Sequence, residues 1–319
     1  MGVGDLGKLE EMVIQYAGVT GEVLPEIPKC CMVVACADHG VYRQKVSAYP
    51  QSTTVGMVKS YVDVKGASAN ALAHYCGAHM VVVDMGINAD MSDVPGLLHR
   101  KIAFGTKDIT EGAAMSRAEA IHAIEAGIEI AENKIKEGYR VFTVGEMGIA
   151  NTTASACILG AFNRWNAVEV TGRGTNISDA RLLHKIEMVQ KALDVNQPDP
   201  TDGLDVLSKV GGFEFGCMTG VMLGAAANHC LTIIDGFNST ASAFIAKALS
   251  EESVQYLMAS HLSLEQAHRK SLKAIGLTEY IDLDIRLGEA VGASIQKKIL
   301  DMAIVVYKDG ADKRTGVAE

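Results

Sequence analysis

The sequence predicts an α/β fold in which a mostly parallel sheet is flanked by helices, and two observations lead to this expectation. Apolar runs typical of buried strands recur along the chain, and a helical stretch follows each of them. Glycine and acidic residues also gather at the end of each run. The runs are Cys31 to Ala37, Met80 to Asp84, Val141 to Val144 and Leu231 to Asp235. This alternation is typical of βαβ units, and ligands of such sheets bind where the carboxyl ends of the strands meet.

The helices are predicted from apolar residues at helical spacing. They span Arg117 to Glu137, Ser178 to Leu193, Glu214 to Asn228, Ser239 to Leu249 and Leu287 to Tyr307. A chain of 319 residues, 48% of them hydrophobic, can bury one large core. We therefore expect a single Rossmann-like domain over residues 1–319, with a smaller helical part formed by about residues 1–28 and 250–319.

Composition and charge disfavour several classes of partner. The chain carries 29 basic and 38 acidic residues, and no basic run is interleaved with aromatic residues, so nucleic acid is not an expected partner. No uncharged run reaches the roughly 20 residues that span a bilayer, so no membrane association is expected. The seven cysteines show no C-x-x-C spacing, which favours a reduced, cytoplasmic location. The histidines lack metal-ligand spacing, and we expect neither a metal nor a cofactor.

The segment from Val144 to Thr153 is the most informative motif, because it reads as a strand, a glycine turn and the start of a helix. Unpaired N–H groups and the positive end of the helix dipole suit a phosphate or a carboxylate there. Glu146 is unexpected beside an anion. It is tolerated if it grips hydroxyl groups or accepts a proton, or if it turns away into a structural hydrogen bond.

A second glycine cluster, Gly172-Arg173-Gly174-Thr175, precedes a predicted helix that carries Lys185. Glycines, a hydroxyl group, a cation and a helix start can form a phosphate cradle. The cluster lacks the third glycine of a dinucleotide-binding fingerprint, and it is not a Walker A loop. A surface turn is the alternative interpretation.

Glu289 lies between Gly288 and an apolar stretch at the predicted start of a helix. Apolar neighbours would raise its pKa toward that of a general base, whereas an acid in the first turn of a helix can also simply complement the helix dipole. Asp38-His39 lacks the context of a metal site or a catalytic triad, so a structural hydrogen bond between these two side chains is the prediction.

Together these motifs resemble one family, the nicotinate-nucleotide–dimethylbenzimidazole phosphoribosyltransferases, which activate the lower ligand of cobamides. The matching segments run in family order through nearly the whole chain. They are Ala37-Asp38-His39-Gly40-Val41, Val46-Ser47-Ala48-Tyr49-Pro50-Gln51, Asp84-Met85-Gly86, Gly145-Glu146-Met147-Gly148 with Asn151-Thr152-Thr153, Thr171-Gly172-Arg173-Gly174-Thr175, His184-Lys185, Gly211-Gly212, Asp235-Gly236-Phe237 and Leu287-Gly288-Glu289.

The resemblance implies transfer of the 5-phosphoribosyl group of nicotinate mononucleotide to an aromatic base, with release of nicotinate and inversion to the α-riboside. It implies Glu289 as the general base and Glu146 as a second carboxylate near the ribose or the base. The implied residues for the nucleotide and its phosphate are Gly148, Asn151, Thr152, Thr153, Gly172, Arg173, Gly174, Thr175, Lys185, Asp235, Gly236 and Phe237. The implied acceptor pocket is Ser47, Tyr49, Gly56, Met147, Leu287 and Ala290.

The sequence departs from the family pattern around the implied acceptor pocket. Gly56 stands where members often have Gln, Ala150 stands where they have Gly before Asn-Thr-Thr, and Ala290-Val291 replaces a Gly-Ser pair. A branch of the family transfers to phenol or p-cresol with a paired, related subunit, and this branch is an alternative. A dimer, homo or hetero, is expected. A non-catalytic partner subunit and a dinucleotide-dependent oxidoreductase are alternatives of other classes. The two glutamates argue against the first, and the absent glycine fingerprint argues against the second.

Overall fold

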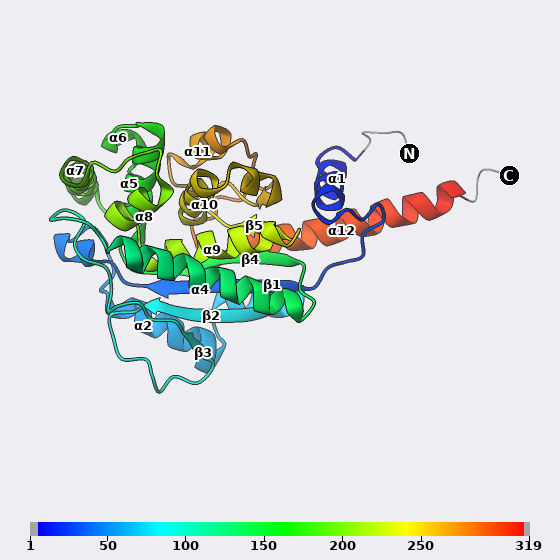
Figure 1. Ribbon diagram of the computed structural model, residues 1–319, viewed down its shortest axis with the longest axis horizontal. Coiled ribbons are helices and arrows are strands. Elements are labelled where there is room, and N and C mark those ends of the chain that lie inside the picture. Colours follow the sequence, from blue (N-terminus) through cyan, green and yellow to red (C-terminus); the bar gives the residue numbers. More distant parts are fainter. Residues whose placement is uncertain (1–5, 316–319) are drawn as a thin grey trace.

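The computed structural model describes residues 6–315, and its centre is one six-stranded sheet (Figure 1). The strands are β1 (Cys30–Ala37), β2 (His79–Gly86), β3 (Leu97–His99), β4 (Val141–Met147), β5 (Leu231–Ile234) and β6 (Leu257–Ala259). Their order is β3-β2-β1-β4-β5-β6, and every neighbouring pair is parallel. From β1 the chain first builds one half of the sheet and then returns to β4 to build the other half. The carboxyl ends of β1 and β4 therefore flank the switch point of the topology.

Both faces of the sheet are buried, because side chains of a strand point alternately to opposite faces. In β1, Cys31, Val33 and Ala35 belong to one apolar cluster, whereas Met32 and Val34 belong to the other. This double burial explains why the strands read as continuous apolar runs in the sequence.

The first face is covered by a group of helices that includes four of the five predicted from the sequence. They are α4 (Arg117–Lys136), α5 (Asn151–Asn163), α6 (Ala167–Val170), α7 (Asp179–Asn196), α8 (Gly203–Val210), α9 (Phe213–Ala227), α10 (Phe237–Leu249) and α11 (His268–Ile275), with the short turn η3 (Glu251–Tyr256). Helices α4 and α9 pack through glycine. A Cβ at Gly220 would lie 2.9 Å from both Gly127 Cα and Ile124 C, which is closer than side chains allow.

The second face is covered by α1 (Lys8–Thr20), α2 (Ser52–Lys59), the π-helical turn η2 (Ser60–Val64), α3 (Ser68–Cys76) and α12 (Val291–Thr315), and η1 (Gly40–Gln44) follows β1. Figure 1 shows α12 extending beyond the end of the sheet, with α1 beside it. Met12 and Val13 of α1 and Leu300 and Ile304 of α12 are buried in the same apolar cluster. Segments near both ends of the chain therefore lie together on this face.

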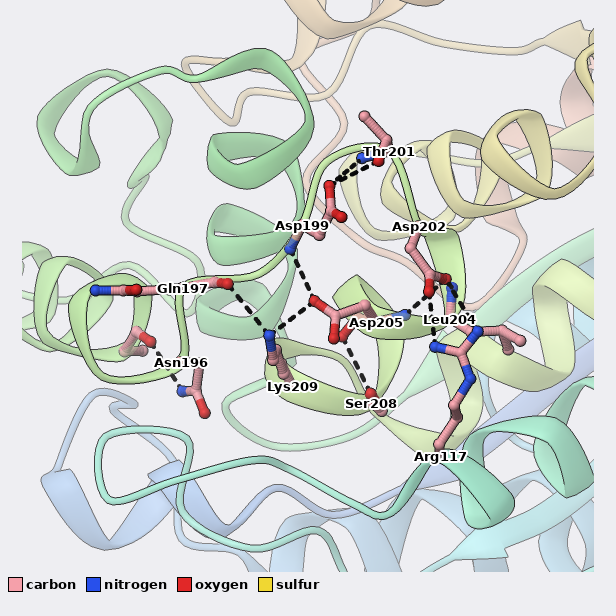
Figure 2. A network of polar contacts seen from close by, with 11 residues as sticks. Arg117, Asn196, Gln197, Asp199, Thr201, Asp202, Leu204, Asp205, Ser208 and Lys209 are labelled. Carbon is pink, nitrogen blue, oxygen red and sulfur yellow. Dashed lines mark hydrogen bonds and ion pairs between the residues drawn. The ribbon is translucent and has the colours of Figure 1, made fainter.

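The loop between α7 and α8 is held by a polar network, which Figure 2 shows. Asp202 caps α8 by accepting hydrogen bonds from the N–H groups of Leu204 and Asp205, at 3.0 and 3.1 Å. The other oxygen of Asp202 pairs with Arg117 of α4 at 2.8 Å. Lys209 pairs with Asp205 at 2.9 Å. These contacts fix the loop to α4 and α8.

The α/β class and the parallel sheet predicted from the sequence are confirmed. Two details differ. The short edge strands β3 and β6 were not predicted, since three residues carry no periodic signal. The last helix begins at Val291 and not at Leu287, because the residues before it form a loop with left-handed backbone. No helix in the described part of the chain combines the length and apolarity that a membrane span requires.

Candidate active site

A cavity of about 590 Å³ lies at the carboxyl edge of the sheet, beside the switch point between β1 and β4. Segments that follow β4, β5 and β6 form much of its wall. The loop before α12 and residues from 46–57 and 174–176 complete it. The acids and glycines that follow the strands in the sequence therefore meet at one place.

Glu146 lies near the end of β4 and lines the cavity. Its side chain is buried, and Asn151 Nδ2 donates a hydrogen bond to Oε2. The loop before α12 passes directly over the other oxygen. A Cβ at Gly288 would overlap Oε1 and would lie 3.3 Å from the carboxyl carbon. Glycine at position 288 thus lets the loop approach the carboxylate closely.

Glu289 reaches the cavity from the loop before α12. Its backbone is left-handed, with φ of 66°, and so is that of Ala290, with φ of 61°. Non-glycine residues seldom adopt this conformation, and it is found where the surrounding structure enforces it. Gly145 of β4 packs closely against these two residues. A Cβ at position 145 would lie 2.6 Å from Glu289 C and 2.8 Å from Ala290 Cα. The strand and the loop are in direct backbone contact.

The two carboxylates share a poorly solvated environment. Burial, together with the nearby carboxylates of Glu214 and Glu289, raises the pKa of Glu146 to about 7 against the opposing hydrogen bonds of Asn238 and Asn151. Burial also raises the pKa of Glu289, and the neighbouring Tyr61 hydroxyl acts in the opposite direction. Glu146 is therefore poised to change protonation state near neutral pH, and the protonated form of Glu289 is favoured relative to an exposed glutamate.

Asp235, Gly236 and Phe237 follow β5 and line the cavity beside Glu146. Asp235 Oδ1 accepts a hydrogen bond from Ala293 N–H at 3.0 Å, which ties the first turn of α12 to the sheet. Burial raises the pKa of Asp235 to about 8. Asp235 therefore positions the segment that carries Glu289.

The predicted phosphate side is formed by the first turn of α5 and the turn at 174–175. Gly148, Asn151 and Thr152 line the cavity, as do Gly174 and Thr175. Lys185 lies behind this wall. Its Nζ donates to Thr152 Oγ1 at 2.8 Å and to the Gly172 carbonyl at 3.1 Å, and burial lowers its pKa to about 8. The lysine thus fixes the two halves of the cradle to each other.

Besides Lys185, three residues predicted for the nucleotide lie outside the cavity wall. Thr153 is fully buried in α5. Gly172 packs against the carboxylate of Glu265. Arg173 turns away to pair with Asp179 and to donate to the Ile177 carbonyl at 2.8 Å. These three residues shape the cradle from behind it.

The predicted acceptor pocket is partly assembled. Ser47, Tyr49, Met147 and Leu287 line the cavity. Gly56 lies in α2 away from the wall, with no atom within 4 Å of a Cβ placed on it. Ala290 is fully buried in the apolar cluster of the second face and does not line the cavity. Two of the positions at which the sequence departs from the family pattern thus lie off the cavity surface.

Several lining residues carry no signal in the sequence. Glu265 accepts a hydrogen bond from Gly174 N–H at 2.8 Å, and its other oxygen has no partner within the described residues. His261 lies 3.8 Å from Asp235, and burial lowers its pKa to about 4. Asn238 accepts from Ser155 at 2.6 Å. These residues follow β5 and the short strand β6, and the missed strand β6 is the reason that His261 and Glu265 were not placed at this edge.

The predicted hydrogen bond between Asp38 and His39 is wrong. His39 Nε2 instead lies 2.5 Å from Glu214 Oε1 in a fully buried pair. Asp38 accepts from Thr54 Oγ1 at 2.7 Å and from Asn88 N–H at 2.8 Å. Adjacent side chains of an extended segment point to opposite sides, so Asp38 and His39 cannot pair with each other. Each side chain instead bonds to residues of distant elements. No three His, Cys, Asp or Glu side chains within residues 6–315 are placed to hold a metal ion.

Comparison with known proteins gives one consistent result. A family model described as "Phosphoribosyltransferase" matches residues 1–317. The curated nicotinate-nucleotide–dimethylbenzimidazole phosphoribosyltransferase of Chloroflexus aggregans is 45% identical over 317 residues, which cover 99% of this chain and 90% of the relative. The protein of the same name from Geotalea uraniireducens is 43% identical over 318 residues, with the same coverage of both chains.

Solved structures agree with the sequence matches. A crystal structure of the enzyme of this name from Thermus thermophilus has a TM-score of 0.89 and 37% identity, covering 94% of this chain and 89% of that chain. A structure titled CobT from the same organism has a TM-score of 0.91 at 37% identity, covering 95% of this chain and 91% of that chain.

Proposed function

Because the chain belongs to the nicotinate-nucleotide–dimethylbenzimidazole phosphoribosyltransferase family, we propose that it transfers the 5-phosphoribosyl group of nicotinate mononucleotide to 5,6-dimethylbenzimidazole. The bond between C1′ and the acceptor nitrogen forms while the bond between C1′ and the nicotinate nitrogen breaks. The N–H proton of the acceptor passes to Glu289, and nicotinate leaves. Attack from the face opposite the leaving group inverts C1′ and gives the α-riboside 5′-phosphate.

One observation carries this proposal: Glu146 and Glu289 reach the same cavity from two elements whose backbones are in contact. Departure of nicotinate leaves positive charge on the ribosyl ring. Carboxylates held near the ring stabilise that charge, because they are fixed before the reaction begins. A carboxylate whose pKa is raised toward neutrality also suits a general base.

The charge of the donor prepares both groups for this role. The pyridinium nitrogen of nicotinate mononucleotide is positive, and an opposite charge within a few ångströms favours ionised carboxylates. Binding of the donor therefore lowers the pKa of Glu146 and Glu289 and ionises them when they are needed. The 5′-phosphate is proposed to lie at the first turn of α5, against Gly174 and Thr175, where backbone N–H groups and the nearby Lys185 favour an anion.

The acceptor is proposed to lie among Tyr49, Met57, Met147 and Leu287, which give one end of the cavity an apolar character. Phenol and p-cresol would fit the same kind of surface. Of the positions that suggested them from sequence, Gly56 and Ala290 lie off the cavity wall, whereas Ala150 lines it. The similar proteins are named for dimethylbenzimidazole, so the benzimidazole is the acceptor that we propose, and the phenols serve as competing substrates in the test.

We propose further that the chain works as a dimer of two identical copies. Figure 1 shows α1 and α12 together beyond the end of the sheet. These two helices carry exposed apolar side chains: Ile14 is 65% exposed, Met302 is 55% exposed and Val305 is 43% exposed. Burial of such side chains favours association. Light scattering on the purified chain tests this, and a monomer that dimerises only with a related subunit would favour the heteromeric alternative.

The experiment for the activity follows nicotinate by chromatography. The purified chain is incubated with nicotinate mononucleotide and with dimethylbenzimidazole, phenol or p-cresol in parallel. We expect acceptor-dependent release of nicotinate that is fastest with the benzimidazole, and a product whose NMR spectrum is that of the α-anomer. Release with none of the acceptors would contradict the proposal. A faster reaction with p-cresol would show that the acceptor is a phenol and not the benzimidazole. An unchanged rate in Glu289→Gln would show that Glu289 is not the base.

A further inference from the structure

We propose that Tyr61 is a positioning residue for Glu289, and that its hydroxyl donates a hydrogen bond to Glu289 Oε2 whenever that carboxyl group is ionised. This inference rests on the proposed function, because it assigns the support of the proposed base. It concerns a residue outside the cavity wall, on the turn η2.

The first observation is a pair of unsatisfied buried atoms. Tyr61 Oη and Glu289 Oε2 are both buried, and neither has a hydrogen-bond partner within the described residues. Tyr61 is 2% exposed and Glu289 is 4% exposed. An unpaired buried polar atom is destabilising, so such atoms pair when a donor and an acceptor are close to one another. A hydroxyl hydrogen rotates freely to reach its acceptor.

The second observation is that these two groups are neighbours. Tyr61 packs in the same buried cluster as Ala290, the residue that follows Glu289. Their electrostatic influence is mutual: proximity of the carboxylate adds to burial in raising the pKa of Tyr61, and the hydroxyl opposes the burial that raises the pKa of Glu289. The hydroxyl therefore favours the ionised form of Glu289.

The third observation is that the backbone is arranged to place this tyrosine. Helix α2 passes into a π-helical turn at Ser60–Val64, and such turns are frequent at functional sites. The wider turn changes the hydrogen-bonding pattern of the carbonyl groups. Asn70 Nδ2 donates to the Tyr61 carbonyl at 2.9 Å, so a side chain from α3 fixes the turn. Tyr61 is thus held firmly at the point where it meets Glu289.

The other groups around Glu289 do not replace this donor. Glu146 from β4 and Asp235 from β5 are acids. His261, after β6, is neutral because burial lowers its pKa to about 4. Ser260 Oγ donates to the Asp235 carbonyl at 2.8 Å and so accepts from His261 Nδ1 at 3.2 Å, which uses the single N–H of the neutral ring. Arg286, in the same loop as Glu289, is directed to Asn176 at 3.4 Å. From β1, the Cys36 thiol stays protonated, since burial raises its pKa well above the usual value.

The chemical consequence concerns both oxygens of Glu289. A hydroxyl that occupies Oε2 leaves Oε1 to receive the proton of the acceptor. It also holds the carboxyl group in one rotamer, which matters because small misplacements of a catalytic group reduce the rate strongly. Without the hydroxyl, Glu289 takes up its proton at higher pH and loses its fixed orientation.

The test compares Tyr61→Phe with Tyr16→Phe, a buried tyrosine of the same apolar cluster that lies in α1 away from the cavity. Glutamate labelled with ¹³C at the side-chain carboxyl reports the titration of Glu289, assigned with Glu289→Gln. We expect Glu289 to titrate at higher pH in Tyr61→Phe and at the wild-type pH in Tyr16→Phe. Titration at the wild-type pH in both variants would overturn the proposal, and this readout does not depend on turnover.

Kinetics give the second readout. In Tyr61→Phe the acid limb of the kcat profile should move to higher pH, with about a tenfold loss of kcat below it, while KM for nicotinate mononucleotide stays near wild type. In a Glu289→Gln background, Tyr61→Phe should cause no further loss of kcat. An undiminished additional loss in that background would show that Tyr61 acts independently of Glu289. Absence of turnover in the wild type would contradict the proposed function and would leave the titration to decide on Tyr61.

Discussion

The contact between β4 and the loop before α12 makes Gly145→Ala a sharp test of the site's geometry. The added Cβ would lie 2.6 Å from Glu289 C and 2.8 Å from Ala290 Cα. An ordinary contact is about 3.4 Å, so the loop would have to retreat by about 0.8 Å at Glu289 C and by more at Ala290 N, which is the nearest atom. Both opposing atoms belong to the backbone, so no side chain can rotate to relieve the overlap. Overpacking of this kind costs about 1–3 kcal/mol.

The effect on catalysis should exceed the effect on stability. A displacement near 1 Å of a catalytic group costs about a hundredfold in rate, and we expect this loss in kcat/KM for Gly145→Ala at 25 °C, where the variant remains folded. The assay is acceptor-dependent release of nicotinate, normalised to the folded fraction by circular dichroism. Gly220→Ala is the matched control, because its Cβ would lie 2.9 Å from Ile124 C at the interface of α4 and α9, remote from the cavity.

The two variants separate stability from positioning. Gly220→Ala should lower the melting temperature and keep the kcat/KM of its folded fraction. If Gly145→Ala retained wild-type kcat/KM, or if both variants lost activity only in proportion to unfolding, the contact would not position Glu289 and the reasoning would be refuted.

Other perturbations probe the remaining parts of the site. Glu289→Gln should reduce kcat by about a hundredfold or more, because it removes the base. The kcat/KM of the wild type should fall at acid pH as Glu289 takes up its proton, and an acid limb of the same position and size in Glu289→Gln would contradict this. Lys185→Met should raise KM for the donor about tenfold and leave the acceptor KM unchanged, as measured by initial rates; an unchanged donor KM would place the phosphate elsewhere. Asp235 has a pKa raised from 3.8 to about 8 on folding, so its contribution to stability is present at low pH and lost as pH rises toward 8. Asp235→Asn stays neutral, and the fall in melting temperature between pH 5 and pH 8 should therefore be smaller than in the wild type by about 2–5 °C. An equal fall in both proteins would show that Asp235 does not carry this dependence.

Two acids of the site could be predicted because they lie at the ends of buried strands. Glu146 is near the end of β4, after a run that is apolar because both faces of the strand are covered, and Asp235 directly follows β5. Parallel pairing then brings such strand ends to one edge. No knowledge of side-chain packing is needed for that step.

The parts that were missed depend on long-range packing. His39 pairs with Glu214, which lies 175 residues away, and no local pattern connects them. Glu265 follows β6, whose three residues are too few for a periodic signal. The left-handed backbone of Glu289 and Ala290 is imposed by contact with Gly145, so the sequence around Glu289 reads as a helix start although it forms a loop.

The central claim is that Glu146 and Glu289 act on one ribose from opposite sides, with its phosphate at the first turn of α5. A crystal structure of Glu289→Gln with nicotinate mononucleotide and dimethylbenzimidazole bound tests it most directly. We predict C1′ between the side chains of residues 146 and 289, the acceptor nitrogen beside residue 289, and the phosphate against Gly174 and Thr175. A nucleotide bound with C1′ remote from Glu146, or with its phosphate at another edge of the cavity, would contradict the claim.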